Sequence, residues 1–165
     1  MRGALVIGLG NPLRGDDGLG WHVIEQLRGT GVEGHADLLA CHQLTPELAA
    51  PVAQSARVIF VDAAQGGLVG EVCLERINPE AGSAARPAAL SHHLDPAGLI
   101  RYTKQLYAEV PEAMIVSVRG AAYGLSEHLS EPVLGAIPQV LRVLNELLTG
   151  EALPTGEMEK SWLPT

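Results

Sequence analysis

Short apolar runs alternate with amphipathic stretches along most of this chain. Residues 4–9 are continuously apolar, which is typical of a strand buried on both faces. From Asp17 onward the apolar residues fall at helical spacing, and Gly29 and Gly31 end the predicted helix. Further strands are predicted at 36–40, 57–61, 71–77 and 113–118. Thr45, Asp95 and Ser130 each precede a predicted helix, with a proline close behind.

The later elements differ in character. Residues 57–61 form an unbroken apolar run that predicts a central parallel strand ending at Asp62, whereas 71–77 alternate and predict an edge strand. Residues 78–90 have no period and predict a connection. The helix after Asp95 should bury a stripe of side chains along one side. The final helix, which Gly150 ends, should pack a second, apolar stripe against the sheet. The first stripe is Leu99, Thr103, Leu106 and Val110.

This order of elements predicts an α/β fold, a three-layer α/β/α sandwich around a mostly parallel sheet of about five strands. Residues 1–150 form one predicted domain, and residues 151–165 form a polar C-terminal tail.

Composition narrows the choice of function. The net charge is −8 and no Lys/Arg cluster occurs, which argues against nucleic acid as a partner. No run of eighteen uncharged apolar residues and no signal-peptide pattern is present, so we expect a soluble cytoplasmic protein with no membrane segment. The two cysteines, Cys41 and Cys73, are expected to be free thiols.

The stretch from Val6 to Gly20, Val-Ile-Gly-Leu-Gly-Asn-Pro-Leu-Arg-Gly-Asp-Asp-Gly-Leu-Gly, joins the first strand to the first helix. It is not a dinucleotide fingerprint, because Leu13 stands where the third glycine belongs and two aspartates would repel a pyrophosphate. Asp16 and Asp17 therefore form either a cation site or a cap of the following helix.

Other candidate ligands follow the ends of further strands. Asp62 should reach the same edge of the sheet as Asp16 and Asp17, although it could equally form a turn. His92 and His93 precede a helix, as ligands, acid/base groups or a solvated pair. Two carboxylates and one imidazole make a three-ligand set for a borderline divalent ion. Cys41 and His42 follow the second strand, either as additional soft ligands or as a buried cysteine beside an exposed histidine.

Three of these features together resemble the hydrogenase maturation endopeptidases. They are the Gly-Asn turn leading to Asp-Asp-Gly, the apolar strand that ends in Asp62, and Ser91-His92-His93-Leu94. Members of that family remove a short C-terminal extension from the large subunit of a nickel-iron hydrogenase after nickel insertion. The resemblance implies that Asp17, Asp62 and His92 are the metal-binding and catalytic residues, with His93 as the alternative to His92. The nickel would arrive with the precursor of the large subunit, which would be the partner.

The chain departs from this family after its second strand. Better-known members carry an Asp-Gly-Gly type of turn there, whereas this chain has Ala40-Cys41-His42-Gln43-Leu44-Thr45. Bulkier residues at this position should narrow or reshape the cleft, so the departure leaves the identity of the substrate open.

Two other functions compete with the protease. The same acids could belong to a nickel-binding assembly chaperone that recognises a hydrogenase subunit without cutting it. Gly8-Leu9-Gly10-Asn11-Pro12 is also similar to the opening of the peptidyl-tRNA hydrolases. Those enzymes need a catalytic histidine shortly afterwards, where this chain has Arg14-Gly15-Asp16-Asp17, and its acidic balance suits tRNA poorly.

Overall fold

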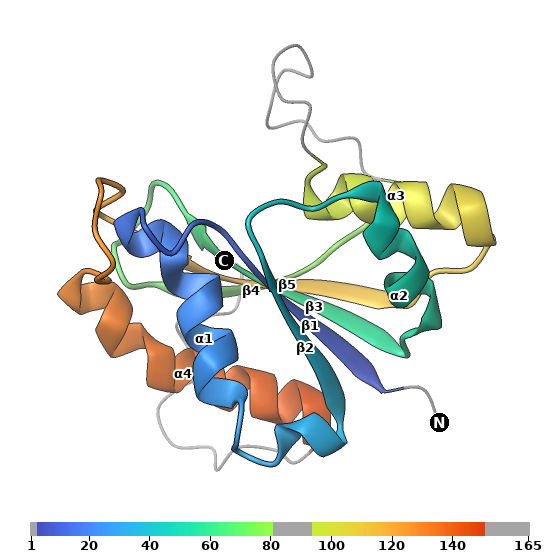
Figure 1. Ribbon diagram of the computed structural model, residues 1–165, viewed down its shortest axis with the longest axis horizontal. Helices are drawn as coiled ribbons and strands as arrows, with labels where there is room; N and C mark the ends of the chain where they lie inside the picture. Colours follow the sequence, from blue (N-terminus) through green and yellow to red (C-terminus); the bar gives the residue numbers. More distant parts are fainter. Residues whose placement is uncertain (1–2, 81–93, 151–165) are drawn as a thin grey trace.

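Five strands form one sheet in the order β2-β1-β3-β5-β4, with two helices on each face (Figure 1). This computed structural model describes residues 3–80 and 94–150. The strands are β1 (Ala4–Leu9), β2 (Ala36–Cys41), β3 (Arg57–Ala64), β4 (Val72–Arg76) and β5 (Glu112–Arg119). The helices are α1 (Leu19–Leu27), α2 (Ala49–Gln54), α3 (Pro96–Tyr107) and α4 (Glu131–Thr149), with short 3₁₀ turns at Gly15–Gly18, Val32–Gly34 and Pro46–Leu48.

Strands β1, β2, β3 and β5 are parallel, and β4 runs antiparallel at one edge. The carboxyl ends of the four parallel strands therefore lie at one edge of the sheet, which we call the carboxyl edge. The most apolar runs, β1 and β3, occupy the interior of the sheet, because only a strand covered on both faces needs to be apolar throughout.

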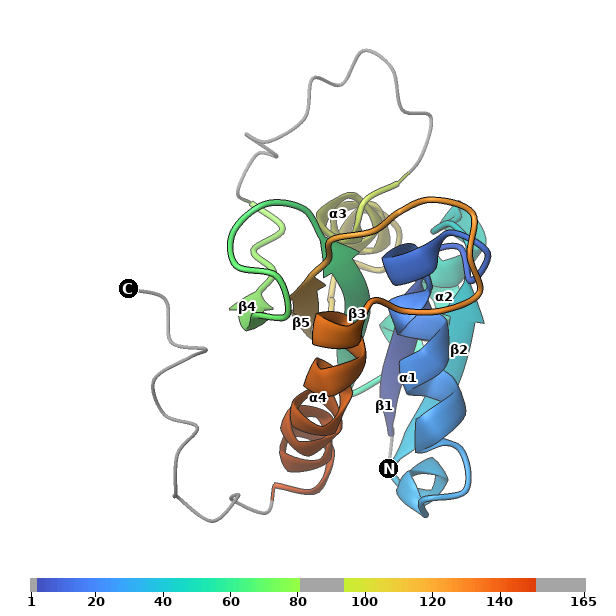
Figure 2. The same cartoon turned by 90° about the vertical axis from the view of Figure 1, so that its left-hand side faces the viewer.

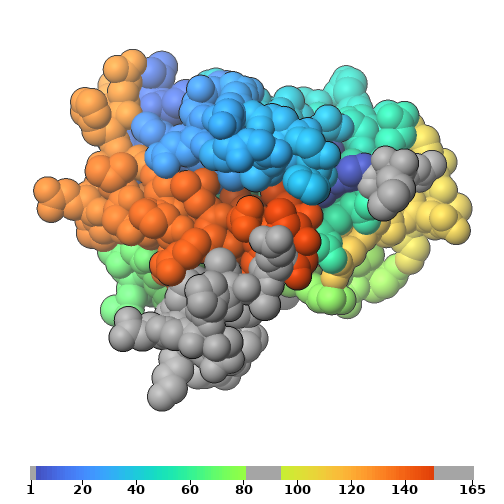
Figure 3. All heavy atoms as spheres, turned by 90° about the horizontal axis from the view of Figure 1, so that it is seen from below, coloured from blue at the N-terminus to red at the C-terminus, as the bar shows by residue number. Residues whose placement is uncertain are grey.

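Alternate side chains of the central strands build two separate cores. Val6, Ile59 and Val61 pack with α1 and α4, whereas Ile7 and Phe60 pack with α2 and α3. Figure 2 shows the two pairs of helices on opposite sides of the sheet. In the view from below in Figure 3, α1 (blue) and α4 (orange to red) lie side by side across one face.

The predicted fold class is confirmed, as are the five strands and the edge position of residues 71–77. The prediction that Asp62 ends its strand is wrong, because β3 continues to Ala64. The reason is that β5 keeps pairing with β3 as far as Ala64↔Arg119, while pairing with β1 stops at Gly8↔Val61.

Two helix predictions also need correction. In α3, Leu99 and Thr103 are buried as expected, but Leu106 is 55% exposed. Val110 is not in the helix, which ends at Tyr107 because Ala108 takes a φ of 62°. Thr45 occupies the predicted cap position, but its side chain makes no capping hydrogen bond.

Among the residues that the structure describes, no helix is both long and apolar enough to cross a membrane. The predicted tail, 151–165, lies outside the described residues, and the division into domain and tail stays a prediction.

Candidate functional site

The strand order reverses between β1 and β3. The chain leaves β1 toward β2 on one side of the sheet and leaves β3 toward β4 on the other. Connections that diverge in this way open a crevice beyond the carboxyl ends of the two strands, which is where open α/β sheets bind their ligands. Asp17 lies in the 3₁₀ turn after β1, and Asp62 lies near the end of β3. The fold therefore places both predicted acids at the carboxyl edge, on the two strands between which such a crevice is expected.

Asp17 is half-buried and held by the turn that precedes it. Its Oδ2 accepts a hydrogen bond of 2.9 Å from the backbone N–H of Asn11. Gly10 makes this approach possible, since its φ is +119° and an added Cβ would lie only 1.8 Å from the carbonyl oxygen of Asp17. The glycine before Asn11 is thus a steric requirement for the position of Asp17.

Asp62 is also half-buried, and its Oδ1 accepts a hydrogen bond of 2.8 Å from the N–H of Ala63. Because Val58 and Phe60 face α2 and α3, the alternation of the strand turns Asp62 toward the same side of the sheet. Cys41 of β2 packs on that side as well. Burial raises the pKa of the Cys41 thiol, and the charge of Asp62 raises it further, which favours the protonated thiol over the thiolate.

Asp16 behaves differently from its neighbour. It is completely buried, and Gly18, not Asp16 or Asp17, occupies the cap position of α1 without a side-chain capping bond. The helix-cap interpretation of the pair is therefore wrong. Oδ2 of Asp16 accepts hydrogen bonds from the N–H groups of Ala121 (2.8 Å) and Ala122 (2.9 Å), and from the hydroxyl of Ser130 (2.9 Å). Oδ1 accepts a hydrogen bond of 2.7 Å from the Ser130 N–H.

These bonds decide the ionisation state of Asp16. Burial by itself raises the pKa of the carboxyl, but the hydrogen bonds from Ala122, Ala121 and Ser130 together lower it below the ordinary value. Asp16 is thus a buried carboxylate whose negative charge is stabilised by these donors, and its role is to hold the loop after β5. Sequence reasoning missed this role, because the donors lie more than a hundred residues further along the chain.

Tyr123 is a second residue that sequence reasoning missed. It is half-buried, and its hydroxyl donates a hydrogen bond of 2.9 Å to the carbonyl oxygen of Ala64, at the end of β3. Burial raises the pKa of Tyr123, and the negative charge of Asp16 adds to this, with smaller contributions from Asp17 and Asp62. The phenol therefore lies within electrostatic reach of all three acids. A tyrosine in a glycine-containing loop gives no sequence signal of such a position.

His42 packs against an aromatic side chain at the carboxyl edge. Its ring meets that of Trp21 edge to face, with 5.3 Å between ring centroids, and the Trp21 indole N–H donates a 2.7 Å hydrogen bond to the carbonyl oxygen of Gly10. The two rings are thus tied to the turn that carries Asp17. No described contact assigns a metal to Cys41 or His42.

His92 and His93 lie outside the described residues. The next residue, Leu94, forms an antiparallel bridge with Leu44, three residues after the end of β2. The described chain thus resumes close to the carboxyl edge. Within 3–80 and 94–150, no three His, Cys, Asp or Glu side chains lie close enough together to hold a metal ion. The assignment of Asp17, Asp62 and His92 or His93 as a ligand set stays a prediction.

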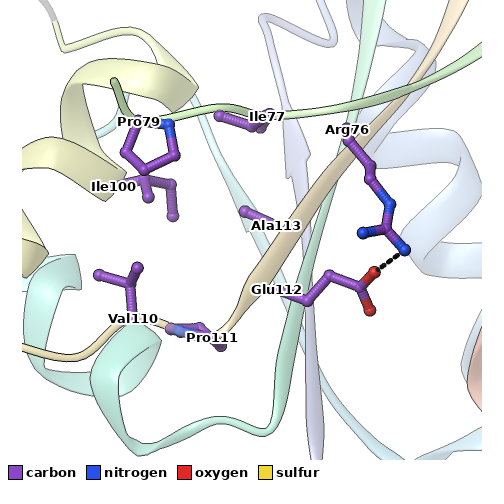
Figure 4. A pocket seen from close by; sticks show the side chains of 8 residues that line it. All are labelled: Arg76, Ile77, Pro79, Ile100, Val110, Pro111, Glu112 and Ala113. Atoms are coloured by element: carbon purple, nitrogen blue, oxygen red, sulfur yellow. Dashed lines mark ion pairs between the residues drawn. The ribbon is translucent and has the colours of Figure 1, made fainter. Parts of the chain in front are cut away.

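A pocket of about 390 Å³ lies elsewhere, at the amino end of β5 (Figure 4). Its wall is mostly apolar, with Ile100 of α3 on one side and an ion pair of 2.6 Å between Arg76 and Glu112 on the other. This end of β5 is opposite to the carboxyl edge. The pocket is therefore separate from the crevice beside Asp17 and Asp62.

Comparison with known proteins identifies solved structures of similar fold. A hydrogenase 2 maturation peptidase from Thaumarchaeota archaeon SCGC_AB-539-E09 matches with a TM-score of 0.67 and 23% identity, covering 91% of this chain and 100% of that one. A NiFe hydrogenase maturation protease HycI from Thermococcus kodakarensis KOD1 matches with a TM-score of 0.71 and 24% identity, over 90% and 93% of the two chains.

The hydrogenase maturating endopeptidase HybD from E. coli matches with a TM-score of 0.69 and 20% identity, over 91% of this chain and 93% of that one. No protein-family model and no curated protein sequence matches the chain. The chain therefore shares the fold of these maturation proteases over nearly its whole length, as its sequence motifs suggest.

Proposed function

We propose that this chain is a hydrogenase maturation endopeptidase, which removes the C-terminal extension of the large-subunit precursor of a nickel-iron hydrogenase after nickel insertion. The observation that carries the proposal is the position of Asp17, in the turn after β1, and of Asp62, near the end of β3, on the two neighbouring strands between which the strand order reverses. Support also comes from the solved structures of the same fold, which are described as maturation proteases.

The donor chemistry suits a nickel ion that belongs to the substrate. Carboxylate oxygen and imidazole nitrogen are suitable ligands for a borderline divalent ion. Asp17 accepts the Asn11 N–H through Oδ2, and a carboxylate has further lone pairs with which to bind a cation. In the proposal, Asp17, Asp62 and His92, or His93 in its place, bind nickel that the precursor already holds.

Docking through the ion would position the substrate. With nickel bound near the crevice, the C-terminal segment of the precursor would lie along the carboxyl edge, so that the scissile peptide bond is held close to the same acids. The ion would supply polarisation of the carbonyl or activation of a water molecule. The chain's own contribution is to hold two carboxylates in place at the crevice.

The test is incubation of the purified protein with nickel-loaded precursor, followed by measurement of the mass of the large subunit. The proposal expects loss of the C-terminal extension, and no loss when the precursor lacks nickel. Asp17→Asn and Asp62→Asn keep the size of each side chain but remove its charge. Each substitution should slow cleavage by at least about 10- to 100-fold, which is the loss expected when a residue hydrogen-bonded to a metal ligand is removed.

Asp37→Asn is the matched control. Asp37 is exposed and lies near the amino end of β2, at the opposite end of the sheet from the crevice, so this variant should cleave at the normal rate. His92→Ala and His93→Ala compared in the same assay assign the imidazole ligand. If the wild-type protein binds the precursor but leaves its extension intact, it acts as an assembly chaperone instead, and the protease proposal is wrong.

A further inference from the structure

The sheet itself does not fix Asp17 relative to Asp62. Hydrogen-bonded pairing of β1 with β3 ends at Gly8↔Val61, one residue before Asp62. Beyond that point β3 pairs with β5 alone, as far as Ala64, and β1 turns away into the segment that carries Asp17. Separation of the strands opens the crevice, and it also removes the ladder that would set the distance across it.

The loop between β5 and α4, residues 120–130, bridges this separation. Figure 2 shows it in orange, passing over the blue turn that follows β1. On the β1 side, Ala121, Ala122 and Ser130 of the loop donate four hydrogen bonds to the carboxylate of Asp16. Three backbone hydrogen bonds support the same contact: Asp16 N–H to Ala122 (2.8 Å), Gly15 N–H to Ser126 (2.8 Å) and Ser126 N–H to Leu13 (3.0 Å).

On the β3 side the loop is attached to Ala64, two residues beyond Asp62. The carbonyl oxygen of Ala64 accepts a hydrogen bond of 2.9 Å from the Gly120 N–H and another of 2.9 Å from the Tyr123 hydroxyl. Gly120 also brings the two attachments together. An added Cβ at this position would lie 2.5 Å from the Tyr123 hydroxyl oxygen and 3.0 Å from the Cβ of Asp16, so only glycine lets both side chains pack there.

We propose that the β5–α4 loop is a brace that sets the position of Asp17 relative to Asp62, and that Asp16 and Tyr123 are its positioning residues. Asp16 is the residue before Asp17 in the chain. The hydrogen bonds that Asp16 accepts therefore fix the backbone from which the Asp17 carboxylate projects. Tyr123 attaches the same loop to the end of β3. The inference rests on the proposed function for the purpose of the two acids, but the coupling between them belongs to the fold alone.

The sharpest variant is Tyr123→Phe, which removes one hydroxyl and keeps the ring. Its matched control is Thr103→Val, because Thr103 is completely buried in α3 and donates a hydrogen bond of 2.8 Å to a backbone carbonyl, that of Leu99. Both variants lose one hydroxyl bonded to a carbonyl, so they should lower the melting temperature by similar amounts. Only the first breaks the brace.

The first readout is the affinity of the whole protein for Ni²⁺ alone, measured by titration calorimetry. We expect Tyr123→Phe and Asp16→Asn to weaken Ni²⁺ binding, by about 10- to 100-fold for Asp16→Asn, and Thr103→Val to leave it unchanged. Ser130→Thr should retain normal affinity because it keeps the hydroxyl, whereas Ser130→Ala should not. Equal affinities for the wild type and a folded Tyr123→Phe would overturn the proposal, as would an equal loss in Thr103→Val.

The second readout does not depend on nickel. In Tyr123→Phe the carboxyl ¹³C resonance of Asp17 should shift or split, although the lost hydroxyl was bonded to the far side of the crevice, and in Thr103→Val it should stay in place. An unmoved Asp17 resonance overturns the brace even if the protein binds no metal. Conversely, the wild-type protein could show this coupling and still not cut the precursor. In that case the brace is retained and the proposed protease function is wrong.

Discussion

Gly10 shows how one residue without a side chain determines the position of another. Its φ of +119° is unfavourable for other residues, and an added Cβ would overlap the backbone of Asp17. Gly10→Ala should therefore destabilise the protein by about 2 kcal/mol or more, since it combines backbone strain with a clash that only movement of the turn can relieve. Urea denaturation measures the loss.

Gly29→Ala separates the two contributions. Gly29 also has a positive φ, +81°, but no atom lies within 4 Å of an added Cβ, so alanine there should cost only about 1 kcal/mol from strain. In the cleavage assay Gly10→Ala should be strongly impaired and Gly29→Ala normal. Equal stability losses in the two variants would show that the close approach of Gly10 to Asp17 is not a constraint.

The contrast between Asp16 and Asp17 marks the limit of what their sequence tells. Both follow the same strand and both were candidates for a cap or a cation site. Asp16 is completely buried under donors from the loop after β5, whereas Asp17 accepts one hydrogen bond within the described part of the chain, from the Asn11 N–H. Their different roles depend on partners from the far end of the chain, and no local pattern encodes those partners. Tyr123 was missed for the same reason.

Helix α3 begins with a cap that the sequence does encode. Oδ1 of Asp95 accepts a hydrogen bond of 2.6 Å from the Gly98 N–H, and Pro96 takes the first helical position. We predict that Asp95→Ala lowers the free energy of unfolding by about 1 kcal/mol. Asp37→Ala, at an exposed position in β2, should change it little. A cap variant as stable as the wild type would mean that packing of Leu99 and Ile100 alone holds this helix.

Most elements whose signal is local were predicted well, but the end of α3 and the end of β3 were not. The apolar runs predict β1 and β3. Asp95 predicts the start of α3 and Gly150 predicts the end of α4, because each of these signals depends on residues close in sequence. The extension of β3 past Asp62 depends on pairing with β5, more than fifty residues later. Asp62 accordingly lies inside a strand and not after one.

For the whole molecule, the carboxyl edge follows from the topology. A parallel arrangement of β1 and β3 was expected from their apolar character, and it brings the segments carrying Asp17 and Asp62 to the same edge. The strand order β2-β1-β3-β5-β4 could not be predicted from the sequence. The crevice expected between β1 and β3 therefore became apparent only in the structure. The histidine ligand stays a prediction, because His92 and His93 fall outside the described residues.

The buried carboxylate of Asp16 should make the stability of the whole molecule depend on acid pH. Its hydrogen bonds lower its pKa in the folded protein below the ordinary value, although burial opposes them. A lowered folded-state pKa contributes stability that is present above the pKa of the unfolded chain, about 4, and that is lost as the pH falls through the folded value. The β1 turn and the loop after β5 should then lose their main attachment.

Urea denaturation of the wild type and Asp16→Asn between pH 3 and pH 7 tests this dependence. Asn has no charge to lose, so the wild type should be clearly more stable at pH 7, and the difference should shrink as the pH falls below about 4. Of the groups near Asp16, Tyr123 stays protonated throughout this range, since the ordinary pKa of a phenol is about 10 and burial, then the charge of Asp16, raise the pKa of Tyr123 above it. Asp17 is present in both proteins. A difference that is constant from pH 7 to pH 3 would mean that the charge of Asp16 contributes nothing to holding the loop.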